Sequence, residues 1–210
     1  MSTSETIFIV DDDESVLRSL GRLFLTEGYS VDAFSSPQDL LEERDPERAG
    51  CVVLDLRMPQ MSGLEVQEAL RQDGLILPIV FISGSSDVPA AVHAIKGGAL
   101  DFLLKPFDED ALLEAVGRAV ERGRRQRRRR DEHCVVEARL ARLTPRELQV
   151  ARLVTEGLLS KQIAAELGTA ESTIALHRSR IMRKLEVDSV AELVRLFIGP
   201  LDDESESAAQ

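Results

Sequence analysis

CVVLDLRMP, residues 51–59, is the stretch that decides the fold of this chain. Its first four residues are apolar, and the run ends directly in Asp55. A short apolar run rich in β-branched residues predicts a strand that is buried on both faces of a parallel sheet. A carboxylate at the end of such a strand lies where open α/β sheets bind their ligands. Taken alone, Asp55 is better explained as a cap of the following turn, so a functional role depends on which other residues converge on it.

Segments with strand and helix patterns alternate along the first half of the chain. Apolar and β-branched runs predict strands, and apolar residues spaced three to four apart predict helices. The predicted strands are 6–10, 30–34, 51–54, 78–83 and 100–104, and the predicted helices are 14–27, 37–43, 63–72 and 88–96. This alternation predicts an α/β fold in which helices cover both faces of a parallel sheet.

Five polar residues follow the ends of these predicted strands: Asp11, Asp12, Asp55, Ser83 and Lys105. In the strand order 2-1-3-4-5 the strands that carry the three acids are neighbours, so the carboxylates would crowd together. Like charges at that distance repel unless a cation or a proton intervenes. Each residue also has a structural explanation: an acid can favour a helix start, a serine can cap a helix, and a lysine can be solvated. Their joint placement at one edge favours a shared site.

The residue types at this edge suit phosphoryl transfer. Carboxylates without histidine or cysteine favour a hard ion bound through oxygen, such as Mg²⁺. A carboxylate beside Mg²⁺ can act as a nucleophile toward a phosphoryl group. Lys105 would then neutralise the transferred charge, and the Ser83 hydroxyl would donate to a phosphate oxygen.

Four motifs resemble the receiver domain of two-component response regulators: VDDD at 10–13, LDLRMP at 54–59, SG at 83–84 and KPF at 105–107. The resemblance covers about residues 4–122 and implies a flavodoxin-like (βα)5 domain with sheet order 2-1-3-4-5. It implies that Asp55 is the phosphoacceptor and that a sensor histidine kinase is the phosphodonor.

The same resemblance implies roles for the residues around Asp55. The Mg²⁺ ligands would be Asp11, Asp12, Asp55 and the backbone carbonyl of Arg57. Ser83 and Phe102 would form the switch pair beside the catalytic Lys105, and the Lys105–Pro106 bond would be cis.

The segment after the predicted sheet is rich in arginine. Apolar spacing predicts a helix from residue 108, and no proline interrupts the chain between 107 and 144. Residues 122–130 contain seven arginines. They could form an arm that contacts DNA phosphates. They could equally belong to a solvated helical or flexible linker whose charges keep it from packing.

The rear half has the pattern of a helix-turn-helix. Thr144 and Glu147 form a capping box around Pro145 and begin a first helix. Ser160 is expected to cap a second helix at 161–167, and a third helix is expected at 171–185. Short helices joined by a tight turn that contains glycine are typical of this DNA-binding motif. Any small three-helix domain could show the same pattern.

Three further motifs resemble the LuxR-type DNA-binding domain: LTPRELQV at 143–150, GLLSKQIAAELG at 157–168 and STIALHRSRIMRKL at 172–185. Together with the receiver motifs, they make the chain similar to the FixJ-like branch of the NarL/FixJ family. The expected DNA-binding residues are Ser160, Lys161, Ser172, Thr173, Leu176, His177, Ser179, Arg180, Arg183 and Lys184. Ala170 stands where the family usually has a serine, which weakens the helix cap unless Thr169 substitutes.

Charge divides the chain into two parts. The formal net charge is −11, and the first 120 residues carry nine basic and 22 acidic side chains. Residues 121–142 carry nine basic and four acidic side chains. An acidic front and a mildly basic rear predict two domains with different partners.

Two cysteines, Cys51 and Cys134, form no disulfide or metal-ligand pattern, and we expect reduced thiols. No apolar stretch is long enough to cross a membrane, and no signal pattern begins the chain. We therefore expect a cytoplasmic protein with no membrane partner.

These patterns predict a receiver domain at 1–121, an arginine-rich helical linker at 122–137, a LuxR-type domain at 138–200 and an acidic, disordered tail at 201–210. We expect a response regulator, not an enzyme, that forms a homodimer on phosphorylation. Its partners would be promoter DNA and RNA polymerase, with transcription activated. One rival is an aspartyl-phosphate hydrolase, but Arg57 replaces the second acid that such enzymes carry. The other is a DNA-binding protein whose receiver only dimerises.

Overall fold

A computed structural model describes residues 5–43, 50–72 and 77–198 of this chain. The chain divides into two compact units, residues 1–127 and 128–210, and each is described by itself. The predicted acidic tail at 201–210 lies outside the described residues.

The first unit is a parallel sheet with helices between its strands. Its elements are β1 (Thr6–Val10), α1 (Glu14–Thr26), β2 (Ser30–Phe34), α2 (Pro37–Glu43), β3 (Gly50–Asp55), α3 (Gly63–Gln72), β4 (Ile79–Ser83), α4 (Val88–Lys96) and β5 (Asp101–Leu104), followed by α5 (Glu109–Leu140). The strand order is β2-β1-β3-β4-β5, and all described pairs are parallel. The predicted α/β fold and the predicted strand order are confirmed.

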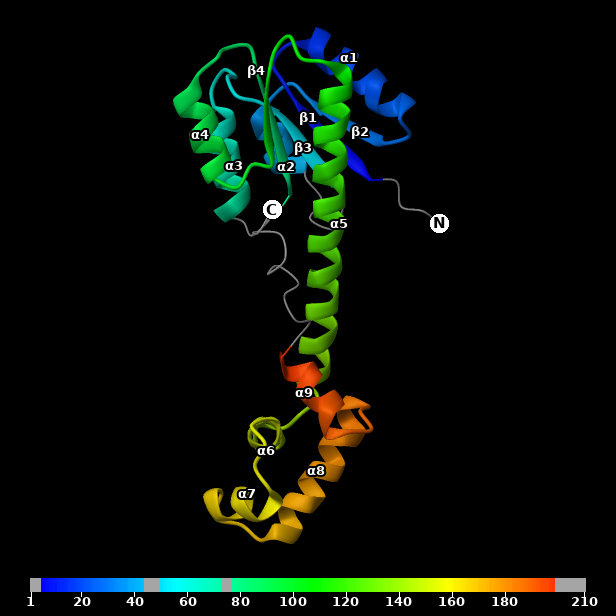
Figure 1. Ribbon diagram of the computed structural model, residues 1–210, viewed down its shortest axis with the longest axis vertical. Helices are drawn as coiled ribbons and strands as arrows, with labels where there is room; N and C mark the ends of the chain where they lie inside the picture. Colours follow the sequence, from blue (N-terminus) through cyan, green and yellow to red (C-terminus); the bar gives the residue numbers. More distant parts are fainter. Residues whose placement is uncertain (1–4, 44–49, 73–76, 199–210) are drawn as a thin grey trace. The chain divides into compact units, whose positions relative to one another are not determined.

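Alternate residues of the central strands pack into two separate hydrophobic cores, one on each face of the sheet. In β1, Ile7 and Ile9 pack with α1 and α5, whereas Phe8 and Val10 pack with α2, α3 and α4. Figure 1 shows the two groups of helices on opposite faces of the sheet. Every residue of β1, β3 and β4 is buried, which is why these strands read as continuous apolar runs in the sequence.

Gly63 brings the start of α3 against the end of β3. A Cβ at this position would lie 2.4 Å from the carbonyl oxygen of Asp55 and 2.8 Å from the Phe81 ring. Only glycine allows the two backbones to come this close. The loop that carries Asp55 is therefore packed tightly under α3.

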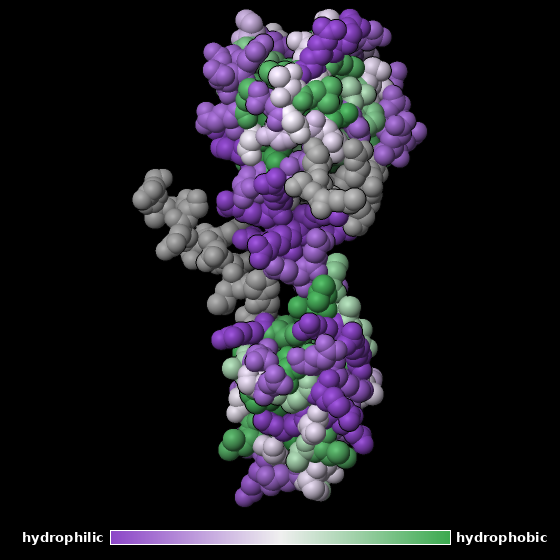
Figure 2. Space-filling model, turned by 90° about the vertical axis from the view of Figure 1, so that its right-hand side faces the viewer, coloured by the Kyte–Doolittle hydropathy of each residue, from purple (hydrophilic) through white to green (hydrophobic). Residues whose placement is uncertain are grey.

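α5 runs without a break through the arginine-rich stretch. Its arginines form ion pairs one helical turn away, such as Arg125 with Glu121 at 3.1 Å and Arg128 with Glu132 at 3.0 Å. Each exposed pair of this kind stabilises a helix by ~0.3–0.5 kcal/mol. Figure 2 shows this part of the surface as strongly hydrophilic.

The second unit contains four described helices after α5: α6 (Pro145–Thr155), α7 (Ser160–Glu166), α8 (Glu171–Leu185) and α9 (Val190–Ile198). Ile163, Ile174, Ile181 and Leu185 are buried in one core between them. α9 was not among the predicted helices, although its start carries a recognisable capping signal. Glu192 N donates to Ser189 Oγ at 3.1 Å, the serine-to-glutamate spacing of a capping box.

Among the helices in the described part of the chain, none is both long enough and apolar enough to cross a membrane.

The two cysteines differ sharply in exposure, which predicts a difference in reactivity. Cys134 is exposed, whereas Cys51 is fully buried in β3, and burial raises the pKa of the Cys51 thiol to about 12. At pH 8 only on the order of one Cys51 in 10⁴ would be the reactive thiolate. A thiol-reactive dye should therefore titrate one thiol in the native protein and two in urea. Cys134→Ser should leave none in the native protein; two native thiols in wild type would contradict the burial of Cys51.

Candidate functional site

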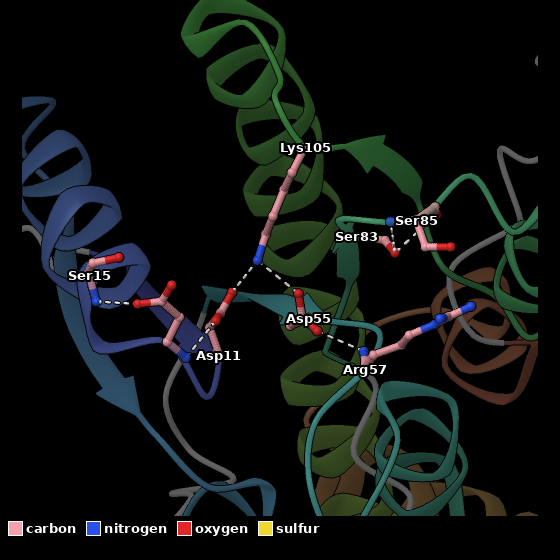
Figure 3. A network of polar contacts seen from close by, with 8 residues as sticks. Asp11, Ser15, Asp55, Arg57, Ser83, Ser85 and Lys105 are labelled. Carbon is pink, nitrogen blue, oxygen red and sulfur yellow. Dashed lines mark hydrogen bonds and ion pairs between the residues drawn. The ribbon is translucent and has the colours of Figure 1, made fainter.

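Four polar side chains meet at the carboxyl edge of the sheet. Asp11 follows β1, Asp55 ends β3, Ser83 ends β4 and Lys105 follows β5. Figure 3 shows Asp11 and Asp55 on two sides of the Lys105 ammonium. Asp11 is 1 % and Asp55 is 6 % exposed, so both carboxylates need partners inside the protein. Of the five residues predicted at this edge, Asp11, Asp55 and Lys105 are in direct contact, Ser83 lies at the same edge, and Asp12 is exposed.

Lys105 joins the two carboxylates. Its Nζ lies 2.5 Å from Asp11 Oδ2 and 2.8 Å from Asp55 Oδ1. The other oxygens accept backbone hydrogen bonds: Asp11 Oδ1 from Asp13 N at 2.9 Å and Asp55 Oδ2 from Arg57 N at 2.6 Å. Both acids are thus held in one orientation by donors on both oxygens.

The environment shifts the protonation of Asp11 and Lys105. Burial raises the pKa of Asp11, and the hydrogen bond from Lys105 opposes this rise. Burial alone would lower the pKa of Lys105, but its hydrogen bonds to Asp11 and Asp55 raise that pKa above the usual value. Lys105 is therefore a cation at neutral pH and supplies a fixed positive charge beside Asp55.

The oxygen ligands at this edge suit a hard divalent cation. Asp11 and Asp55 lie close enough to share one ammonium group, and no histidine or cysteine takes part. Asp12 is exposed at the rim. Within the described residues, no three acidic, histidine or cysteine side chains already surround one point that could hold a metal. The carboxylates and a nearby backbone carbonyl nevertheless have the chemistry that Mg²⁺ prefers.

Ser83 is hydrogen-bonded to Ser85, and Phe102 lies near Phe81. Ser83 Oγ donates to the Ser85 carbonyl oxygen and accepts from Ser85 N, both at 3.2 Å. The Phe102 ring is half-buried, with its centre 6.2 Å from that of Phe81. The Lys105–Pro106 bond is cis, as the resemblance implied.

An apolar patch lies on α4 and β5. It consists of Val88, Val92, Ile95 and Leu104, which are between 45 % and 68 % exposed. Val88, Val92 and Ile95 lie four and three residues apart and so share one face of α4. Exposed apolar side chains on one face are typical of a surface that meets a partner.

In the second unit, α8 presents five of the ten predicted DNA-binding residues to solvent. The exposed ones are Lys161 on α7 and Ser172, Leu176, Ser179, Arg180 and Arg183 on α8, whereas Ser160, Thr173, His177 and Lys184 are half-buried. An exposed helix face of small, polar and basic residues fits the major groove.

Lys184 has an internal partner. Its Nζ lies 2.6 Å from Glu147 Oε2 and 3.2 Å from the carbonyl oxygen of Arg142. Glu147 is buried, and the same oxygen accepts from Thr144 N at 2.9 Å in the predicted capping box. Lys184 therefore anchors α8 to the start of α6, a role that the sequence analysis missed.

One predicted helix cap is wrong, and the expected weak cap at Ala170 is confirmed. Ser160 does not cap α7; the cap residue is Leu159, whose backbone N donates to Gln162 Oε1 at 2.8 Å. The cap residue of α8 is Ala170, without a side-chain hydrogen bond, and Thr169 does not replace it. At α7, Gln162 therefore accepts a hydrogen bond from the cap residue's backbone N, although no side chain caps the helix itself.

Ala170→Ser is expected to stabilise the second unit by ~1 kcal/mol, because serine supplies the missing acceptor at the start of α8. Urea unfolding followed by circular dichroism measures the gain. Ala165→Ser, at an exposed position inside α7, is the control and should give no gain. Equal effects of both substitutions would contradict the capping explanation.

Comparison with known proteins agrees with both units. Residues 7–117 match the response regulator receiver domain, and residues 141–197 match bacterial regulatory proteins of the luxR family. Nodulation protein W of Bradyrhizobium diazoefficiens is 43 % identical over 93 % of this chain and 86 % of its own length. FixJ of Azorhizobium caulinodans is 38 % identical over 97 % of this chain and 98 % of its own. The solved structure of the response regulator StyR matches 93 % of this chain and 98 % of its own, at 46 % identity and a TM-score of 0.83.

A receiver domain joined to a LuxR-type DNA-binding domain defines a response regulator that acts on transcription. The chain belongs to the NarL/FixJ family of these regulators.

Proposed function

We propose that Asp55 accepts a phosphoryl group from a sensor histidine kinase. The observation that carries this proposal is the buried Asp55 carboxylate held between Lys105 and the backbone N of Arg57. One carboxylate oxygen attacks phosphorus, the bond from phosphorus to the donor's imidazole nitrogen breaks, and the leaving imidazole keeps the electron pair. Lys105 stays beside the product and neutralises part of its added charge.

Mg²⁺ is the proposed cofactor. The residues that would hold it are Asp11, Asp12, Asp55 and the backbone carbonyl of Arg57. When bound, Mg²⁺ would screen the negative charge of the phosphoryl oxygens from the carboxylates. The oxygen-only chemistry of this edge supports the assignment.

Phosphorylation would then change the conformation of Ser83 and Phe102 and so alter the surface of the first unit. The Ser83 hydroxyl would leave the Ser85 carbonyl for the phosphoryl group, and the Phe102 ring would turn inward. Both residues adjoin the apolar patch of α4 and β5, so this patch is the proposed homodimer contact. A symmetric dimer places two copies of α8 on two DNA half-sites. The DNA-bound dimer would work at promoters in the cytoplasm, with RNA polymerase as its partner in activation.

Phosphorylation is expected to make the wild type dimeric at micromolar concentration and to raise DNA affinity roughly 5–150-fold, the usual range of allosteric coupling. Phe102→Ala should still accept phosphate on Asp55 but remain monomeric, because the ring that links the site to the patch is missing. Sedimentation with and without acetyl phosphate and Mg²⁺ measures both.

Leu25→Ala is the matched control, since Leu25 is a large exposed apolar residue of α1. It should dimerise like wild type. If phosphorylated wild type stays monomeric while DNA affinity rises, the dimer mechanism is wrong, and release of a masked DNA-binding domain explains the response better.

A further inference from the structure

The side chain of Arg57 links the Asp55 loop to α4. Its Nη2 lies 3.2 Å from Asp87 Oδ2, with the two side chains 64 % and 34 % exposed. Arg57 follows Asp55 by two residues, and its backbone N already donates to the Asp55 carboxylate. Figure 3 shows the Arg57 side chain leaving this loop on the side where Ser83 and Ser85 lie.

Asp87 is the N-cap residue of α4, directly before Val88. Its Oδ1 caps the helix by accepting from Ala90 N at 3.1 Å, while its Oδ2 faces Arg57. Asp87 N donates to the Ser85 carbonyl oxygen at 2.9 Å. The Ser83 hydroxyl donates to that same carbonyl oxygen. The start of α4 is therefore bound to the Asp55 edge twice, once through Ser83 and once through Arg57.

We propose that Arg57 is a second switch residue. When Asp55 is phosphorylated, the Arg57 guanidinium leaves Asp87 and binds the phosphoryl group, so the start of α4 loses its ion pair with the Asp55 loop. This inference rests on the proposed phosphorylation of Asp55. An exposed ion pair such as Arg57–Asp87 is weak and easily exchanged. A phosphoryl group offers close to two negative charges and several acceptor oxygens, to which a guanidinium can bind in bidentate fashion. Arg57 is therefore expected to bind the phosphoryl group in preference to Asp87.

Loss of the Arg57–Asp87 ion pair would let α4 shift relative to the Asp55 loop without unfolding the helix. Asp87 Oδ1 can keep the cap on Ala90 N after Oδ2 has lost Arg57. α4 carries three residues of the apolar patch, Val88, Val92 and Ile95. Arg57 and Ser83 would thus release the same segment together, and the released helix is the one that presents the proposed dimer contact.

Binding of beryllofluoride, a stable mimic of the phosphoryl group, tests the exchange in the full chain. Calorimetry in Mg²⁺ compares wild type, Arg57→Gln, Asp87→Asn and the double variant. Asparagine still caps a helix, so Asp87→Asn removes only the charge that holds Arg57. It should tighten beryllofluoride binding roughly 2–5-fold, since the competing ion pair is gone. Arg57→Gln should weaken binding about 10-fold, and the double variant should behave like Arg57→Gln alone.

Arg71→Gln is the matched control, because Arg71 forms an exposed ion pair with Glu68 on α3 at 2.7 Å. It should bind like wild type. Thermal unfolding of each variant checks that folding is unchanged. The exchange is overturned if wild type binds beryllofluoride but Asp87→Asn does not change the affinity. It is also overturned if Asp87→Asn changes the affinity equally in the presence and absence of Arg57. In both cases the phosphoacceptor site itself remains supported. If wild type itself does not bind beryllofluoride, the proposed function falls, and this inference falls with it.

Discussion

Asp55→Ala is expected to reduce phosphoryl incorporation from acetyl phosphate to background, a loss on the order of 10²-fold or more, as removal of a nucleophile gives. Asp55 is the buried carboxylate whose two oxygens are aimed by Lys105 and the Arg57 backbone N. The buried neighbour Asp11 binds Lys105 and Asp13 N in a similar way, so this variant also tests whether Asp11 can accept the phosphoryl group instead. Incorporation of ³²P from labelled acetyl phosphate, with Mg²⁺ present, measures the loss.

Two controls separate this result from damage to the fold. Asp39→Ala removes an exposed acid from α2 and should label like wild type. Wild type with Mg²⁺ removed by EDTA should lose labelling as Asp55→Ala does. Labelling of Asp55→Ala at the wild-type level would show that another carboxylate is the acceptor.

Glu147→Gln is expected to destabilise the second unit by about 1–3 kcal/mol, because the half-buried Lys184 ammonium loses its charged partner. The substitution removes the charge that meets Lys184 at 2.6 Å and weakens the capping box of Thr144. Urea unfolding of the second unit measures the change. Glu166→Gln, at an exposed position on α7, should be within about 0.5 kcal/mol of wild type.

The same pair predicts how stability depends on pH. The hydrogen bond from Lys184 and those from Thr144 lower the pKa of Glu147 from 4.5 to about 2. A folded-state pKa below the unfolded value stabilises the fold above pH 4.5, and this stability is lost as the pH falls toward 2. Glu147→Gln should therefore flatten the acid limb of the stability curve in that window. An unchanged acid limb would show that the Glu147–Lys184 pair does not govern it.

Much of the first unit could be predicted from the sequence because its signals are local. Strands buried on both faces leave apolar runs, and a residue that follows such a run must lie at the sheet edge, as Asp11 and Asp55 do. Each predicted strand and helix of this unit up to residue 104 agrees with the structure to within one residue at either end. The Arg57–Asp87 pair could not be predicted in this way, because 30 residues separate its members and only the folded sheet brings them together.

The second unit shows the same limit. Arg183 and Lys184 are adjacent cations in one basic run, yet only Lys184 turns toward Glu147. Which of the two faces inward depends on the rotation of α8 against α6, which a basic run does not encode. α9 does carry a local signal, because Ser189 and Glu192 have the spacing of a capping box at its start.

Lys184 also affects how the DNA-binding domain would respond to salt. Much of the affinity of a protein for DNA comes from cations that leave the phosphates when basic side chains replace them, and each replacement steepens the fall of log affinity with log salt by ~0.9. The Lys184 ammonium is already neutralised by Glu147 inside its own domain, so it displaces no such cation. The salt slope would therefore include Arg180 and Arg183 but not Lys184, and α8 is less electropositive toward DNA than its sequence suggests.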